Sequence, residues 1–289
     1  FVIRKLWLYS LKESATMNYV KTTDNTQLYF KDWGSGRPVI LLHGWPLSSD
    51  SWDDQAMAIA AAGYRTIAYD RRGFGRSSQP WSGYDYDTLS DDLAAVIEQT
   101  GAQDAVLIGF SMGGGEVARY MSRHNGKGVS KAVLVSSVVP YMLKTSDNSN
   151  GTPQSVFDEM AQGMKADRAK FFASFFKDFF GVSLMSSQAS PEVLEWARSV
   201  TMQASLKATL ESAKSFATTD FRGDLPAFKV PTLIIHGVED KIVPIDAAGR
   251  AAARGIAQAE LIEYDDGPHG LQVTHKDLLT KDLLDFIKR

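Results

Sequence analysis

The sequence contains no cysteine, which excludes disulfide bridges, thiol catalysis and cysteine-ligated metal sites within these 289 residues. It also has no excess of basic charge: 31 lysines and arginines stand against 34 acidic residues, for a net charge of -3. No basic block occurs, so the electrostatic footprint of a nucleic-acid binder is missing. We expect no nucleic-acid partner, no metal and no cofactor, and a reducing, cytoplasmic location.

The chain also lacks an apolar run long enough to span a membrane. Residues 1–11 are strongly apolar, but Arg4 and Lys5 interrupt them and no small-residue cleavage site follows. We expect no membrane partner and treat residues 1–16 as an N-terminal extension. It is either an upstream addition or an arm that packs on its own body or on a neighbouring subunit, and the second reading leaves a homo-oligomer open.

Segments typical of strands and helices alternate from Met17 onward, which predicts an α/β fold with helices on both faces of a mostly parallel sheet. The apolar content of 44% permits a substantial core. We expect an eight-stranded sheet that opens with an antiparallel pair. The strands are expected near residues 18–23, 27–33, 39–42, 65–69, 105–108, 129–135, 231–237 and 259–264, and helices near 51–62, 86–99 and 112–124 and at the end of the chain.

Residues 140–225 show no buried strand but carry helical pieces rich in aromatic residues and methionine. We therefore expect a helical cap here, inserted after the sixth strand of a core formed by residues 17–139 and 226–289. Its underside should cover an apolar pocket, although spacing alone does not show which phenylalanines point down. The candidates, at helical spacing, are Phe171, Phe172, Phe175, Phe176, Phe179 and Phe180.

The pentapeptide Gly-Phe-Ser-Met-Gly at residues 109–113 lies between an apolar strand and a helix. This is the pattern of a nucleophile elbow, in which a sharp, strained turn lifts a serine hydroxyl clear of the sheet edge. The two glycines are required because a Cβ there would collide with the neighbouring strand or helix. The pattern predicts covalent catalysis by Ser111.

A serine hydroxyl needs a histidine to take its proton and a carboxylate to orient that histidine. In α/β-hydrolases these follow the serine in the order acid, then histidine. Asp240 stands in the loop after the strand at 231–237, and His269 stands in the turn-rich loop after the last strand. Glu239 is the alternative acid, but the Asp-x-x-Val-Pro setting favours Asp240.

The other four of the five histidines have structural interpretations. His43 and His236 close strands, where an imidazole commonly bonds loop backbone. His124 ends a helix, where a cation suits the helix dipole. His275 is expected inside the last helix, in contact with solvent.

Hydrolysis also needs donors aimed at the oxyanion of the tetrahedral intermediate. We expect the backbone amides of Met112, after the nucleophile, and of Trp45, in the loop after the strand at 39–42. Pro46 has no amide hydrogen. We expect Trp45, Phe110 and Val243 to line the substrate pocket. The Gly-x-Gly at residues 73–75 is interpreted as a structural loop, since no third glycine opens a helix after it.

Motifs extend this pattern along residues 17–289. They are His-Gly-Trp-Pro-Leu at 43–47, the glycine- and arginine-rich loop at 69–78, Gly-Tyr-Asp-Tyr-Asp at 83–87, the elbow at 109–113 and Thr-Asp-Phe-Arg at 219–222. Together they resemble the cofactor-free bacterial haloperoxidases (non-haem chloroperoxidases) and aryl esterases of the α/β-hydrolase superfamily. The resemblance implies the triad and oxyanion amides named above, hydrolysis of small esters, and a side reaction in which hydrogen peroxide replaces water and yields a peracid that oxidises halide.

Other activities of the same fold remain as alternatives. Epoxide hydrolases and haloalkane dehalogenases use an aspartate at the elbow, and Ser111 cannot form their alkyl-ester intermediate. Lactamases and carbon-carbon bond hydrolases keep the serine, and some members are ligand receptors that retain a triad but turn over slowly. We favour a small-molecule ester as the substrate.

Overall fold

The computed structural model describes residues 18–183 and 188–289. The arm expected at residues 1–16 lies outside this part of the chain. None of the helices within the described ranges combines the length and apolar character needed to cross a membrane.

A single eight-stranded sheet forms the centre of the molecule, in the spatial order β1-β2-β4-β3-β5-β6-β7-β8. The pairs β1–β2 and β2–β4 are antiparallel and the other pairs are parallel. This confirms the predicted α/β-hydrolase architecture. The strands are β1 Tyr19–Lys21, β2 Gln27–Gly34, β3 Pro38–Leu42, β4 Arg65–Tyr69, β5 Ala105–Phe110, β6 Val129–Val135, β7 Thr232–Gly237 and β8 Ala259–Tyr264.

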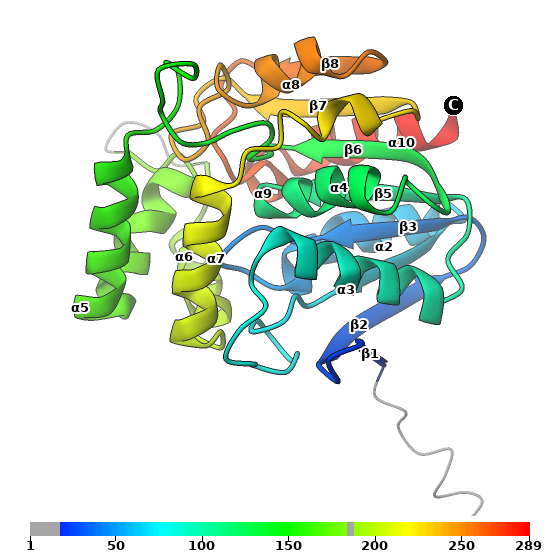
Figure 1. The fold of residues 1–289 in the computed structure, drawn as a ribbon, viewed down its shortest axis with the longest axis horizontal. Helices are drawn as coiled ribbons and strands as arrows, with labels where there is room; N and C mark the ends of the chain where they lie inside the picture. The colour runs from blue at the N-terminus through cyan, green and yellow to red at the C-terminus, as the bar shows by residue number, and fades with distance from the viewer. Residues whose placement is uncertain (1–17, 184–187) are drawn as a thin grey trace, which may run out of the picture.

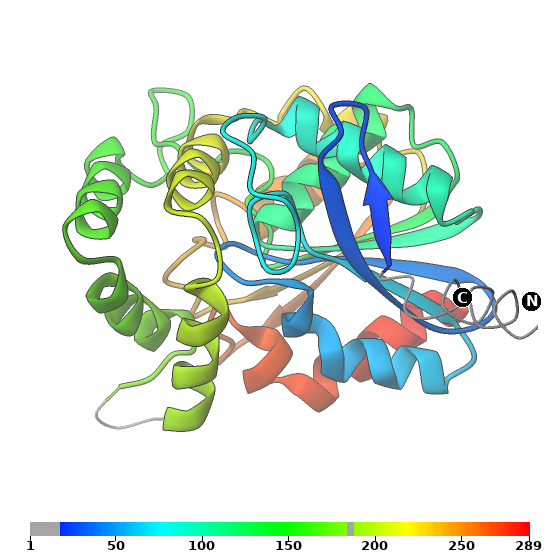
Figure 2. The same ribbon diagram turned by 90° about the horizontal axis from the view of Figure 1, so that it is seen from below.

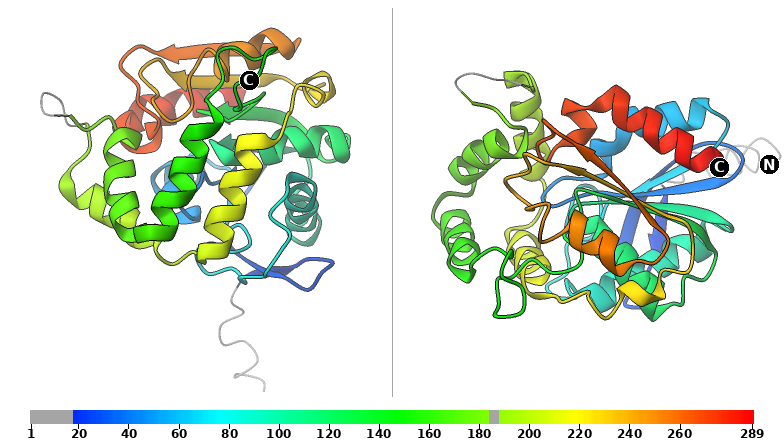
Figure 3. Two further views of the ribbon diagram at one scale, coloured as in Figure 1. Left: turned by 60° about the vertical axis from the view of Figure 1, so that its left-hand side comes forward. Right: turned by 90° about the horizontal axis from the view of Figure 1, so that it is seen from above.

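Helices cover both faces of the sheet, as Figure 2 and the right-hand view of Figure 3 show. One face carries α2 (Asp53–Ala61), which follows the 3-10 turn η1 (Ser49–Trp52), together with α9 (Leu271–Thr274) and α10 (Lys276–Lys288). The other carries α3 (Tyr86–Gln99), α4 (Met112–Arg123) and α8 (Gly249–Gly255), with the short turn η2 (Leu225–Ala227) beside α4 and α8.

Covering both faces explains why the central strands are uninterrupted apolar runs instead of alternating ones. Every residue of β3, β5 and β7 is buried. Among the flanking helices, α3 begins at an ordinary cap, because the Asp85 side chain accepts from the amide of Thr88. The parallel strands β3 to β8 therefore form a rigid platform, and their carboxyl ends meet at one edge.

In the described residues that follow β6 and precede β7 in the chain, three helices lie at that edge: α5 (Gln154–Phe179), α6 (Pro191–Thr201) and α7 (Leu206–Thr218). The arrowheads of β3, β6 and β7 point toward them in Figure 1, and the left-hand view of Figure 3 shows them from outside. We call residues 140–225 the cap. Backbone angles at Asp167 (φ -157°, ψ 90°) are not helical, so α5 is kinked there.

Most of the predicted elements match the observed ones within one or two residues. The final helix is an exception, because the backbone breaks at His275 (φ -124°, ψ 36°) into α9 and α10. His275 therefore lies at a junction, half-buried, where its Nε2 pairs with Asp266 at 3.0 Å. The prediction of a solvated position inside one helix was wrong.

Candidate active site

Ser111 lies in the tight turn between β5 and α4, with a left-handed backbone conformation (φ 53°, ψ -117°). This conformation is rare for a residue with a side chain and stores strain. The turn is possible because its flanks have no Cβ: one added to Gly109 would lie 2.6 Å from the carbonyl oxygen of Gly113, and one added to Gly113 would lie 2.5 Å from that of Leu42. The turn presents the serine side chain at the carboxyl edge of the sheet.

Three residues from distant parts of the chain form one hydrogen-bonded line. The Nε2 atom of His269 lies 2.9 Å from the Ser111 hydroxyl oxygen, and its Nδ1 atom lies 2.7 Å from Oδ2 of Asp240. Because a carboxylate can only accept, Nδ1 carries the proton and Nε2 is left to accept one from the serine. The structure thus brings together the three residues predicted as nucleophile, base and acid.

Asp240 is held as a charged acceptor. Its Oδ1 accepts from the amides of Ile242 (2.9 Å) and Val243 (2.8 Å), so the turn that follows β7 fixes the carboxylate. Burial alone would raise the pKa of Asp240, but the charge of His269 and hydrogen bonds from His236 and His269 outweigh it and hold the pKa below its usual range. Glu239, the alternative acid, is exposed and takes no part in this line.

His269 is fully buried and packed between two phenylalanines. The ring centroids of Phe110 and Phe179 lie 5.0 Å and 4.8 Å from that of its imidazole. Phe110 is itself completely buried and also contacts Trp52, and it is not among the residues that line the cavity. The prediction that Phe110 lines the pocket was wrong, because the residue before the elbow serine points into the core beneath the histidine.

The two amides proposed as oxyanion donors flank the serine. Met112 is the first residue of α4, whose positive dipole end faces the elbow. The loop that carries Trp45 passes directly over the serine, since a Cβ on Gly44 would lie 3.0 Å from that of Ser111. Neither amide donates a hydrogen bond to any residue in the described part of the chain, so both stay available.

A buried ionic network fixes the backbone of that loop. Arg71 pairs with Glu116, and both are almost completely buried. Arg71 also donates from Nη2 to the carbonyl of His43 (2.6 Å) and from its backbone amide to Nε2 of His43 (2.9 Å). Burial and the positive charge of Arg71 lower the pKa of His43 to about 3. His43 is thus a neutral structural residue beside Gly44, as predicted.

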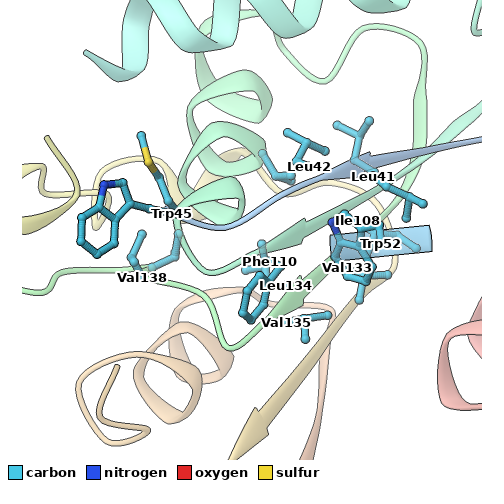
Figure 4. Packing of buried hydrophobic residues seen from close by; sticks show 14 of the residues in the cluster. Leu41, Leu42, Trp45, Trp52, Ile108, Phe110, Val133, Leu134, Val135 and Val138 are labelled. Atoms are coloured by element: carbon cyan, nitrogen blue, oxygen red, sulfur yellow. The ribbon is translucent and has the colours of Figure 1, made fainter. Parts of the chain in front are cut away.

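A cavity of about 310 Å³ opens above Ser111. The indole of Trp45 forms one wall and donates from Nε1 to the carbonyl of Thr209 in α7 (3.0 Å). Trp45 and Val243, both predicted as pocket residues, line the cavity. In Figure 4, Trp45 and Val138 lie to the left of the packed strand residues Leu42 and Ile108, on the side toward which the strand arrows point. Further apolar walls come from Met142, Val156, Phe157, Met160, Phe171, Phe175, Phe216 and Ile242.

Two of the six candidate phenylalanines face this cavity, Phe171 and Phe175. The other four, among them Phe179, are at most 1% exposed and pack inside the cap or against the core. Phe157 and Phe216, which also line the cavity, were not singled out from the sequence. Their role depends on which helix faces meet the core, and helical periodicity within the cap does not fix that.

The remaining histidines and the arginine-rich loop have structural roles. His124 pairs with Asp91 (2.8 Å) at the end of α4, and His236 bonds the carbonyl of Val243 (2.9 Å). The loop at 69–78 is held by buried pairs such as Arg72 with Asp92 (2.6 Å). Across residues 18–183 and 188–289, no group of three or more histidines and acids is placed to hold a metal ion.

Comparisons with known proteins find similar sequences and structures over most of the chain. A family described as "alpha/beta hydrolase fold" matches residues 37–276. The chain is 45% identical to a putative non-heme chloroperoxidase of Synechocystis sp., over 90% of this chain and 95% of the relative, and 42% identical to the bifunctional esterase/perhydrolase DCH of Acinetobacter calcoaceticus, over 94% and 100%. The crystal structure of a bromoperoxidase from Bacillus anthracis superposes with a TM-score of 0.91 at 41% identity, covering 94% of this chain and 99% of that one.

Proposed function

Because the chain belongs to the α/β-hydrolase family, we propose that this enzyme hydrolyses small carboxylic esters through an acyl intermediate on Ser111. The observation that carries the proposal is the unbroken line from Asp240 through His269 to Ser111, which ends at the floor of an apolar cavity. We also propose a cytoplasmic location, which the absence of cysteine supports.

In the first step the Ser111 hydroxyl attacks the ester carbonyl while its proton passes to Nε2 of His269. Asp240 stabilises the imidazolium that forms. The carbonyl oxygen becomes an oxyanion, which the amides of Trp45 and Met112 would bind at about 3 kcal/mol per donor. Collapse of this intermediate breaks the bond to the alcohol oxygen, and His269 returns its proton to the leaving alcohol.

In the second step water takes the place of the alcohol. His269 removes a proton from the water as it attacks the acyl carbonyl, and the second tetrahedral intermediate releases the carboxylic acid and the Ser111 hydroxyl. Water reaches the ester carbon in a cavity of about 310 Å³ that is lined mainly by apolar side chains. That size favours short acyl chains and aryl alcohols over long-chain lipids.

We propose perhydrolysis as a second activity, favoured by the relative named as a bifunctional esterase/perhydrolase. Hydrogen peroxide is close to water in size and easier to deprotonate, so His269 can activate it against the same acyl-enzyme. The product is a peracid, which oxidises bromide to hypobromous acid and returns the carboxylate. In acetate buffer with peroxide and bromide the enzyme should brominate a phenolic dye, and omission of the carboxylic acid should stop the reaction.

Release of the aryl alcohol from 4-nitrophenyl acetate tests the esterase proposal. We expect many turnovers per enzyme molecule, and specificity constants that fall as the acyl chain lengthens from butanoate to octanoate. A single burst without turnover would instead indicate a ligand receptor. Hydrolysis of a lactam or of a carbon-carbon bond in preference to esters would indicate one of the other serine-dependent members of the fold.

A further inference from the structure

Two opposite charges line the active-site cavity, and neither is paired with another residue in the described part of the chain. Lys241, directly after Asp240 in the chain, and Asp178, in the last turn of α5, both line it. They are the single cation and the single anion among its lining residues in the described part of the chain. Both are exposed, so they stand on the solvent side of the cavity, whereas Ser111 is 5% exposed at its floor.

Neither charge is neutralised by another residue that the structure describes. Within residues 18–183 and 188–289, the side chains of Lys241 and Asp178 form no ion pair, either with each other or with another residue. The neighbouring Asp240 carboxylate is buried and fully used by His269 and by the amides of Ile242 and Val243. An unpaired ammonium at the mouth of an apolar cavity attracts an anion more strongly than an exposed one in open water, because the walls lower the local dielectric.

The backbone of Lys241 is held in place by the hydrogen bonds of its neighbour Asp240. The Asp240 side chain accepts from the amides of Ile242 and Val243, and this turn holds the backbone on both sides of Lys241. Ile242 and Val243 line the same cavity. The backbone of Lys241 is therefore fixed beside Asp240, and only the flexible side chain sets where the ammonium group lies.

We propose that Lys241 is a specificity-determining residue that favours esters carrying a carboxylate remote from the scissile bond, and that Asp178 opposes it. This inference rests on the proposed esterase function. The substrate class is either a hemiester of a dicarboxylic acid, with the charge on the acyl side, or an acylated hydroxy acid, with the charge on the alcohol side. In both cases the ester lies at Ser111 and the carboxylate meets Lys241 near the mouth.

The test compares charged and neutral esters of similar size. On the acyl side the pair is mono-4-nitrophenyl glutarate and 4-nitrophenyl pentanoate; on the alcohol side it is 4-acetoxybenzoate and 4-acetoxybenzamide. For each pair the measured quantity is the ratio of kcat/KM for the charged ester to that for the neutral one. Lys241→Gln should lower this ratio about three- to fivefold for at least one pair, the size expected for a partly exposed ion pair.

Asp178→Asn should raise the ratio for the same pair by a similar factor. The matched control is Lys229→Gln, which removes the same charge from an exposed lysine outside the cavity and should leave both ratios unchanged. The pair that responds shows whether the acyl or the alcohol side carries the carboxylate. Unchanged ratios for both pairs in Lys241→Gln, or an equal fall in Lys229→Gln, would overturn the proposal while hydrolysis of the neutral esters continued. Failure of the wild type to turn over the neutral esters would count against the esterase function itself.

Discussion

The ring of Phe179, at the end of cap helix α5, stands edge-on to the imidazole of His269, with 4.8 Å between the ring centroids. The two segments are also tied through the backbone, because the amide of Gly270 donates to the carbonyl of Phe179 at 2.8 Å. The cap therefore does more than roof the serine. Phe179 packs against one side of the His269 ring, and Phe110 packs against another.

Replacing the Phe179 ring with a smaller apolar side chain should therefore impair catalysis without unfolding the protein. Phe179→Leu keeps an apolar side chain but removes the edge contact with His269, so we expect kcat for an aryl acetate to fall about tenfold, while KM changes little. Phe180→Leu is the matched control, because Phe180 is equally buried in the same helix end but has no ring contact with His269. Equal effects of the two substitutions would show that the contact with the histidine is not what matters.

The acid of the triad can be assigned by exchanging each of two adjacent carboxylates for its amide. Asp240→Asn removes the acceptor that fixes the tautomer of His269, and we expect turnover to fall on the order of 10³-fold or more. Glu239→Gln should retain near-full activity, because Glu239 is exposed and outside the hydrogen-bonded line. The opposite result in steady-state kinetics would reassign the acid to Glu239.

Replacing only one partner of the buried Arg71–Glu116 ion pair should lower the free energy of unfolding. Arg71→Met leaves Glu116 charged and unpaired in the core and frees the carbonyl of His43, so we expect a loss of about 3–5 kcal/mol in the free energy of unfolding. The double variant Arg71→Met with Glu116→Leu should recover part of this loss. Urea denaturation measures both. A double variant no more stable than Arg71→Met would argue that loop anchoring, and not the unpaired charge, dominates.

His43 should make the stability of the fold sensitive to mild acid. Its pKa is lowered to about 3 in the folded state, chiefly by burial, whereas it is near 6.5 in an unfolded chain. Between these values the unfolded state binds the extra proton, so the contribution of neutral His43 is complete above about pH 6.5 and is lost as the pH falls toward 3, by at most about 1.4 kcal/mol per pH unit.

The comparison that isolates this effect is between the wild type and His43→Gln, which keeps a hydrogen-bonding side chain but does not titrate. Urea unfolding at pH 7 and at pH 5 should show a smaller loss of stability on acidification in the variant. A loss in the variant as large as that of the wild type would mean that other groups control the acid response.

Much of this molecule could be predicted from the sequence because its core obeys local rules. The strand from Arg65 to Tyr69 and the helix from Tyr86 to Gln99 begin and end where predicted, since apolar runs, caps and turns mark them in the chain itself. The hydrogen-bonded line at Ser111 was also anticipated, because the order of its members follows from the order of the strands that carry them.

The parts that were missed depend on which faces meet in space. Phe110 sits next to the serine in sequence, yet the elbow turns the two side chains in different directions, one to the cavity and one beneath His269. Phe157 and Phe216 reach the cavity from different cap helices, and the pairing of Arg71 with Glu116 joins two segments 45 positions apart. The local sequence around these residues does not indicate which distant residues they contact.

If Ser111 is the nucleophile, it must carry an acyl group during turnover. The direct test is to quench the enzyme with acid during hydrolysis of 4-nitrophenyl acetate and to measure the masses of its peptides. We predict one added acetyl group, located on the peptide containing Ser111, and neither the added mass nor turnover in Ser111→Ala. Continued turnover in Ser111→Ala, or an acetyl group that maps only to other peptides, would show that Ser111 is not the acylated nucleophile.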